Sequence, residues 1–126
     1  MSVNSEIQTF PRGRILLLED DDGVRRSLQL LLQGLGFEVR SFAAATPALA
    51  DPLSAEMDFL IADNRLPDGD GLSALRTLRA RGWQGRAILI TAFPSSGVSE
   101  AAEQAGFAAV LEKPLRQQVL LGALTR

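Results

Sequence analysis

The side chains of this chain that could do chemistry follow short apolar runs. Glu19 and Asp20 come directly after ILLL, Asp63 follows MDFLIA, Thr91 ends RAILIT, and Lys113 is the single lysine beside twelve arginines. Two carboxylates about 5 Å apart repel each other by roughly 3 kcal/mol at an effective dielectric constant of about 20. If the three acids meet, the arrangement costs several kcal/mol unless a cation lies among them. Mg²⁺ suits such a site, because it binds carboxylates, backbone carbonyls and water.

An acidic cluster, one hydroxyl and one ammonium group are together suited to phosphoryl transfer. A carboxylate can attack phosphorus, while a metal ion and a lysine neutralise the phosphoryl oxygens and a threonine hydroxyl donates a hydrogen bond. The acids after ILLL also fit a helix start, where carboxylates bind free N–H groups and face the positive end of the helix dipole. We expect Asp22 to cap a helix in this way, and Asp21 fits either role. Asp63 belongs to a different strand, so helix capping does not explain it.

Apolar runs and helical patterns alternate along the chain, and they must position these side chains. Strands are predicted at residues 15–18, 37–42, 57–62, 86–91 and 108–111. Helices are predicted at 24–35, 72–78, 96–105 and 115–124, with a short one opened by Thr46 as N-cap and Pro47 in its first turn. With right-handed crossovers, this alternation predicts a parallel sheet covered on both faces. Ligands bind at the carboxyl ends of such strands, so the candidate side chains should gather there.

The composition is that of one globular domain of 126 residues. Hydrophobic residues make up 46% and charged residues 22%, and the net charge of −2 gives no general attraction to nucleic acid. The absence of cysteine excludes disulfides and thiolate metal sites, and the absence of histidine removes the usual general base. With no signal-peptide pattern or membrane-length apolar run, we expect a cytoplasmic protein without membrane contact. We divide the chain into a flexible tail, 1–13, and a domain, 14–126.

Four motifs give the chain a resemblance to a known family. They are LLLEDD, LIADNRLPDGDGL, ILITA and LEKPL, and together they extend the resemblance over residues 14–125. On these motifs the chain resembles a bacterial two-component response-regulator receiver domain. The resemblance implies a flavodoxin-like α/β fold, a doubly wound (βα)5 parallel sheet of five strands in the order 2-1-3-4-5. It also implies a signalling protein, with its own phosphorylation and dephosphorylation as its only chemistry.

The resemblance assigns the acceptor and the metal ligands. Asp63 would be the phosphoacceptor and a metal ligand. Asp20 would bind Mg²⁺ directly, whereas Glu19 would act largely through water. The backbone carbonyl of Arg65 would supply a further metal contact.

The same resemblance assigns the groups that hold the phosphoryl oxygens. The backbone N–H groups of Asn64 and Ala92 would bind them, and Thr91 and Lys113 would take the hydroxyl and ammonium roles described above. Phosphorylation would draw Thr91 and Lys113 inward and reshape the face built from the fourth helix and fifth strand. Similar proteins have a cis peptide bond after this lysine, so Lys113–Pro114 is a candidate.

One position departs from the family pattern. Receivers usually carry Tyr or Phe three residues before the lysine, where it acts with the threonine as a conformational switch, and here that residue is Val110. A β-branched side chain cannot swing inward and outward as an aromatic ring does. Phosphorylation should survive this change, but the usual output mechanism is in question. A further expectation is that Arg65 and Phe93, each two residues past a site residue, shield the phosphoryl group from water.

The partners follow from the resemblance and from one absence. Because the chain has no histidine of its own, the phosphoryl group would come from a separate histidine kinase or histidine phosphotransfer protein. We expect no direct nucleic-acid binding by this domain. An effector domain beyond Arg126 is possible in a longer protein.

Two alternatives stay open. The first is a receiver-like interaction module whose signal does not depend on phosphate, which Val110 favours. The second is a phosphatase similar to the haloacid dehalogenases, because residues 20–24, DDDGV, match the D-x-D-G-[TV] opening of those enzymes and would make Asp20 the nucleophile. Such enzymes need a second acidic pair beyond the lysine, and residues 114–126 contain no acid.

Overall fold

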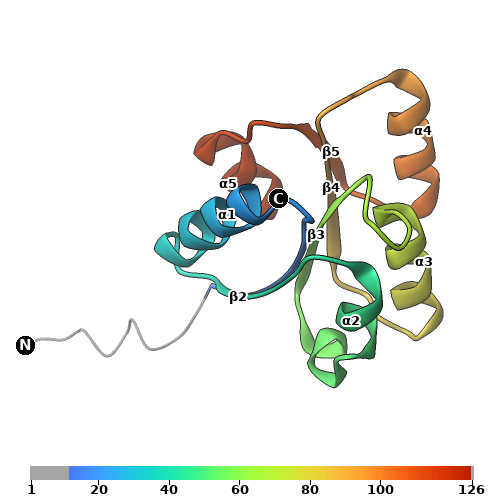
Figure 1. The fold of residues 1–126 in the computed structure, drawn as a ribbon, viewed down its shortest axis with the longest axis horizontal. Coiled ribbons are helices and arrows are strands. Elements are labelled where there is room, and N and C mark those ends of the chain that lie inside the picture. Colours follow the sequence, from blue (N-terminus) through green and yellow to red (C-terminus); the bar gives the residue numbers. More distant parts are fainter. Residues whose placement is uncertain (1–11, 126) are drawn as a thin grey trace, which may run out of the picture.

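A single five-stranded parallel sheet forms the centre of the computed structural model, which describes residues 12–125 (Figure 1). The strand order is β2-β1-β3-β4-β5, with every neighbouring pair parallel. The strands are β1 (Arg14–Leu18), β2 (Glu38–Phe42), β3 (Phe59–Asp63), β4 (Arg86–Thr91) and β5 (Ala109–Glu112). The predicted fold class and strand order are therefore confirmed.

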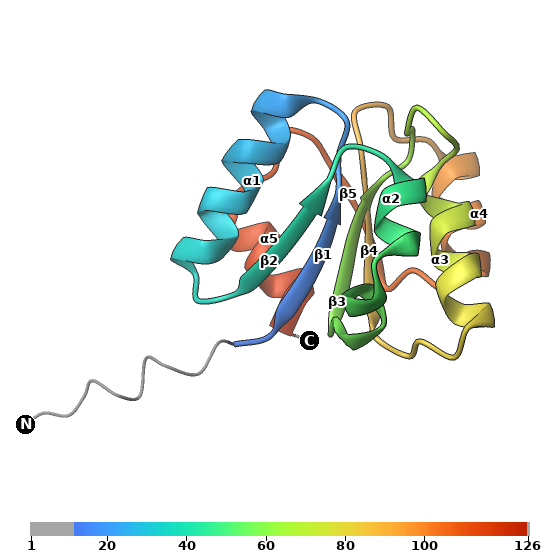
Figure 2. The ribbon, with the colours of Figure 1, turned by 60° about the horizontal axis from the view of Figure 1, so that its bottom comes forward.

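Helices cover both faces of the sheet (Figures 1 and 2). One face carries α1 (Asp22–Gly34) and α5 (Gln117–Thr125), and the other carries α2 (Ala45–Ala50), α3 (Gly71–Ala80) and α4 (Ser96–Ala105). A short 3₁₀ helix, η2 (Pro52–Glu56), connects α2 to β3 and was not predicted. Each parallel connection crosses through a helix, which the alternation of strand and helix patterns required.

The two-sided cover explains why the first strand is apolar throughout. Ile15 and Leu17 pack in the cluster beneath α1 and α5, whereas Leu16 and Leu18 pack in the cluster beneath α2, α3 and α4. All four side chains are buried. Successive residues of a strand point to opposite faces, so a strand with both faces covered has no polar position until it ends. The chain thus becomes acidic where β1 leaves the core.

The start of α1 differs from the prediction by one residue. Asp21 is the N-cap, and its side chain accepts a hydrogen bond of 2.9 Å from the N–H of Val24. Asp22 is instead the first helical residue, where it pairs with Arg25 at 2.6 Å. Asp22 therefore lies at the helix start and faces the positive end of the dipole as predicted, but the capping role belongs to Asp21.

The start of α2 also differs from the prediction. The N-cap is Ala44, and Thr46 lies inside the helix. The carboxylate of Asp68, in the loop after β3, accepts hydrogen bonds from the N–H groups of Ala45 at 2.9 Å and Thr46 at 2.6 Å. The hydrogen bonds from Thr46 and Ala45 lower the pKa of Asp68 to about 2. A residue 22 positions away thus satisfies the N–H groups that a local cap would bind.

The bounds of β4 and α4 are as predicted, whereas the other predicted elements shift by one or two residues at one or both ends; α5, for example, begins at Gln117 instead of the predicted residue 115. The peptide bond between Lys113 and Pro114 is cis, as expected. Across residues 12–125, no helix is long and apolar enough to cross a membrane. The predicted tail falls almost entirely outside the described residues, so its flexibility stays a prediction.

Candidate functional site

The candidate side chains converge at the carboxyl edge of the sheet. Glu19 directly follows β1, Asp63 ends β3, Thr91 ends β4, and Lys113 follows β5. Residues 19, 63 and 91 are all buried although they are polar. Because the four strands run in parallel, residues that are far apart in sequence share one edge. The predicted gathering of these side chains is therefore observed.

The ammonium group of Lys113 joins two of the strand ends. Its Nζ donates hydrogen bonds to Asp63 Oδ2 at 2.7 Å and to Glu19 Oε1 at 2.8 Å. The Lys113 side chain is 17% exposed and the Glu19 side chain 0%. Burial alone would lower the pKa of Lys113, but the hydrogen bonds to Asp63 and Glu19 outweigh it, so this pKa lies above its usual value. Lys113 is therefore a fixed cation of the site and not a solvated surface amine.

Glu19 is held by the protein through both carboxylate oxygens. Oε1 accepts from Lys113, and Oε2 accepts from the N–H of Asp21 at 3.0 Å. The backbone carbonyl of Glu19 also accepts from the side chain of Arg25 at 2.9 Å. Burial raises the pKa of Glu19 despite these hydrogen bonds. Burying a carboxylate this completely costs free energy, which indicates that the site requires it.

The three acids form a group that could hold a cation. Glu19, Asp20 and Asp63 each offer an oxygen, and these oxygens all lie within 4.8 Å of one another. Opposite ligands of an octahedral Mg²⁺ are about 4.2 Å apart, since each bond is about 2.1 Å long. The set fits Mg²⁺ if one acid binds through water. Glu19 suits that role because its oxygens already have partners, whereas the Asp20 side chain is exposed.

One of the predicted backbone donors at the site has a partner within the sheet. The N–H of Asn64 donates to the carbonyl of Ile90 at 2.9 Å, which extends the pairing of β3 with β4. It therefore pairs within the sheet in this structure, which favours another donor for the phosphoryl oxygens, and the role of Asn64 stays a prediction. The N–H of Arg65 instead donates to Asp63 Oδ1 at 3.2 Å. Ala92, the other predicted backbone donor, is exposed directly after Thr91.

Gly71 allows α3 to begin close against the acceptor strand. A methyl group at this position would lie 2.6 Å from the backbone oxygen of Asp63 and 2.9 Å from a methyl carbon of Leu89. Both distances are shorter than real side chains tolerate, and the backbone oxygen cannot give way. Gly71, the second glycine in LPDGDG, is thus required by the close packing against Asp63 and is also the first residue of α3.

A contact that was not predicted crosses the mouth of the site. The guanidinium carbon of Arg65 lies 5.5 Å from the centre of the Phe93 ring, within the range of a cation–π interaction. The N–H of Phe93 also donates to Thr91 Oγ1 at 3.1 Å. The sequence placed both residues two positions beyond site residues, but nothing in it indicated that they touch.

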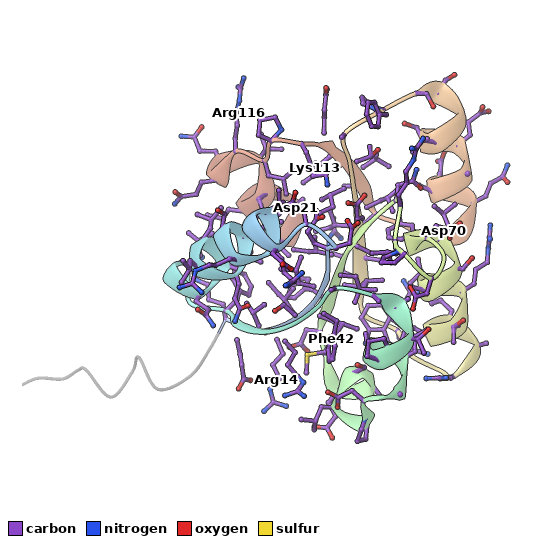
Figure 3. All side chains as sticks on the ribbon, viewed as in Figure 1. Arg14, Asp21, Phe42, Asp70, Lys113 and Arg116 are labelled. Carbon is purple, nitrogen blue, oxygen red and sulfur yellow. The ribbon has the colours of Figure 1, made fainter. Side chains whose placement is uncertain are left out.

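A groove of about 760 Å³ adjoins the site. Asp21, the N-cap of α1, and Leu31 of α1 line one side, and Lys113 and Leu115 line the other from the β5–α5 connection. Ala92 also lines it, so the groove reaches the residue after Thr91. Figure 3 labels Asp21 and Lys113, which mark the two sides.

Comparison with known proteins defines the class to which this fold and site belong. The family model of the response regulator receiver domain matches residues 15–125. The chain therefore belongs to the response regulator receiver family, which serves signalling in two-component systems.

Individual proteins agree with this assignment. The chain is 33% identical over 110 residues to the response regulator protein TodT of Pseudomonas putida, covering 87% of this chain and 48% of TodT. It spans about half the length of the curated relatives that it matches. Chemotaxis protein CheY4 of Vibrio cholerae superposes with a TM-score of 0.83 at 25% identity, covering 90% of this chain and 96% of that one. The BeF3-activated receiver domain of Klebsiella pneumoniae RstA gives 0.80 at 26% identity, covering 88% and 94%.

Proposed function

We propose that Asp63 accepts a phosphoryl group from a histidine of a separate kinase or phosphotransfer protein, with Mg²⁺ held by Asp20, Asp63 and, through water, Glu19. The observation that carries this proposal is the ammonium of Lys113, which bonds to both Asp63 and Glu19 across two strand ends. A structural ion pair with Lys113 needs only one acid. Three acids, Glu19, Asp20 and Asp63, at the same place leave excess negative charge that a bound cation would balance.

The chain's own groups suit the transfer step. An oxygen of Asp63 forms the new O–P bond while the N–P bond of the phosphohistidine breaks, and its electron pair stays on the imidazole nitrogen. Lys113 neutralises one phosphoryl oxygen, Thr91 donates its hydroxyl to another, and the Arg65 N–H takes the role first assigned to Asn64. The carbonyl of Arg65 stays a proposed metal contact. When bound, Mg²⁺ supplies positive charge against the phosphoryl oxygens.

The groove between α1 and the β5–α5 connection supports approach by a donor protein. Its wall is apolar at Leu28, Leu31 and Leu115, and it ends beside Lys113. We propose that the donor packs a helix here, because an amphipathic helix buries its apolar face in such a groove. Its phosphohistidine would then lie close to Lys113 and Asp63.

Intact mass spectrometry tests the acceptor. Wild-type protein incubated with Mg²⁺ and acetyl phosphate should gain one phosphoryl group that hydroxylamine removes. Asp63→Asn should gain none. Asp20→Asn keeps the acceptor Asp63 but lacks a proposed metal ligand, so it should still be phosphorylated, although more slowly. A phosphoryl group that persists in Asp63→Asn and disappears in Asp20→Asn would instead support the phosphatase-like alternative.

One observation favours a second candidate, a receiver-like module that works without phosphate. Val110 stands where the switch aromatic is usual, and it is half-buried against the core. In that case wild-type protein would gain no mass under these conditions, and removing Mg²⁺ would leave partner binding unchanged. The intact set of Asp20, Asp63 and Lys113 supports the phosphoacceptor function over this candidate.

A further inference from the structure

Val110 is poorly suited to move in response to the site. It lies in β5 opposite Leu89 and packs against the apolar cluster beneath α2, α3 and α4. Valine has no polar end that could follow the Thr91 hydroxyl, and its branched Cβ restricts it to few rotamers. A phosphorylation-dependent movement in this chain therefore needs a different side chain.

Phe93 contacts two residues of the candidate site, Thr91 and Arg65. Its backbone N–H donates to Thr91 Oγ1 at 3.1 Å, and its ring lies 5.5 Å from the guanidinium carbon of Arg65. The N–H of Arg65 in turn donates to Asp63 Oδ1. The ring itself is 68% exposed, so no packing against the core holds it in place.

We propose that Phe93, and not residue 110, is the aromatic side chain whose position reports phosphorylation of Asp63; this inference rests on the proposed function above. Both contacts of Phe93 are with groups that a phosphoryl group attracts. Guanidinium groups bind phosphate oxygens through charge-assisted hydrogen bonds, which are stronger than an exposed cation–π contact. Arg65 therefore leaves the ring for the phosphoryl oxygens.

The second contact weakens for a related reason. Rotation of Thr91 toward a phosphoryl oxygen carries Oγ1 away from the N–H of Phe93. The ring and its backbone are then released together, because each of their two partners has turned to the phosphoryl group. Neither step requires Val110 to move.

The release reaches α4 through a short connection. The N-cap of α4 is Ser95, two residues after Phe93, and Ala102 is the only fully buried residue of that helix. A helix with so little buried surface shifts at low cost. The face that changes is thus formed by the exposed ring of Phe93 and the first turn of α4.

Fluorine NMR of protein labelled with 4-fluorophenylalanine tests this inference. The chain has six phenylalanines, and Phe93→Leu identifies one signal by its loss. Mg²⁺, beryllium and fluoride are then added as a phosphoryl mimic, and calorimetry on the same sample measures uptake. We expect the Phe93 signal to shift more than that of any other ring, including the buried Phe37 and the partly buried Phe59.

Matched variants make the result specific. Val110→Ala should keep the shift of Phe93, and Arg65→Met, which retains the aliphatic contact without the charge, should reduce it. Asp63→Asn should show none. Uptake with an unmoved Phe93 signal, or loss of the shift in Val110→Ala, would overturn this inference alone. Absence of uptake by wild-type protein would overturn the proposed function and this inference with it.

Discussion

Replacing Lys113 by methionine removes the only ammonium group between two buried carboxylates. At an effective dielectric constant of about 20, each attraction at 2.7 and 2.8 Å amounts to roughly 6 kcal/mol before desolvation is subtracted. The repulsion between Glu19 and Asp63, at no more than 4.8 Å, is then left uncompensated at about 3 kcal/mol or more. Removing one partner of a buried pair costs about 3–5 kcal/mol net. Because the lysine is 17% exposed, we expect the lower end, about 3 kcal/mol.

Urea unfolding in EDTA, monitored by the fluorescence of Trp83, measures this loss of folding free energy. This residue is the single tryptophan, is buried, and donates from Nε1 to the carbonyl of Met57 at 2.7 Å, so its signal reports the core and not the site. A loss of about 3 kcal/mol would lower the melting temperature by roughly 10 °C for a domain of this size. Arg116→Met is the matched control, because it removes an exposed cation nearby (labelled in Figure 3) and should stay within about 0.5 kcal/mol of wild type.

A double variant sharpens the comparison. Asp63→Asn in the Lys113→Met background removes the unbalanced repulsion, so it should restore about 2 kcal/mol, a value typical of coupled neighbours. Saturating Mg²⁺ should likewise stabilise Lys113→Met more than wild type, because the cluster then lacks its own cation. If Lys113→Met is as stable as the Arg116 control, the ammonium group does not hold these carboxylates, and the reasoning about the site fails.

Three further outcomes are expected. Hydrogen bonds lower the pKa of Asp68, so its stabilisation is complete above about pH 4 and is lost as the pH falls to about 2; acid unfolding should show this loss for wild type and not for Asp68→Ala. Burial raises the pKa of Glu19, so its charged form destabilises the metal-free fold at a pH above that pKa. As the pH falls toward 4.5, the urea midpoint of wild type should therefore rise relative to that of Glu19→Gln. A difference between the two midpoints that does not change with pH would contradict this. Arg65→Ala should shorten the lifetime of phosphorylated protein several-fold by mass spectrometry, because Arg65 turns to the phosphoryl oxygens and shields them from water, and an unchanged half-life would refute this shielding.

The sheet and the meeting of the site residues were predictable for one reason. A parallel strand covered on both faces is a continuous apolar run, and it stops being apolar where it leaves the core. Glu19, Asp63 and Thr91 each stand at such a stop, and parallel topology sends all three stops to one edge. The position of Lys113 followed from the same rule, although its bonds to two different acids did not.

What could not be predicted depends on contacts between distant segments. The difference between Asn64 and Arg65 is a matter of one residue, decided by how far β3 continues to pair with β4. The start of α2 is set by Asp68, which no local capping pattern around Thr46 reveals. The contact of Arg65 with Phe93 joins two loops whose relative height depends on the twist of the sheet.

The carboxylate of Asp68 has a consequence for the direction in which a signal can travel. It fastens the loop beyond β3 to the start of α2, so that loop behaves as a fixed edge of the site. The opposite edge, which leads from Thr91 into α4, has no such anchor among the described residues. Phosphorylation between these two edges should therefore move the loop from Thr91 to α4 more than the loop after β3. Relatives with the same chemical groups could thus transmit to different sides simply by exchanging which edge is tied down.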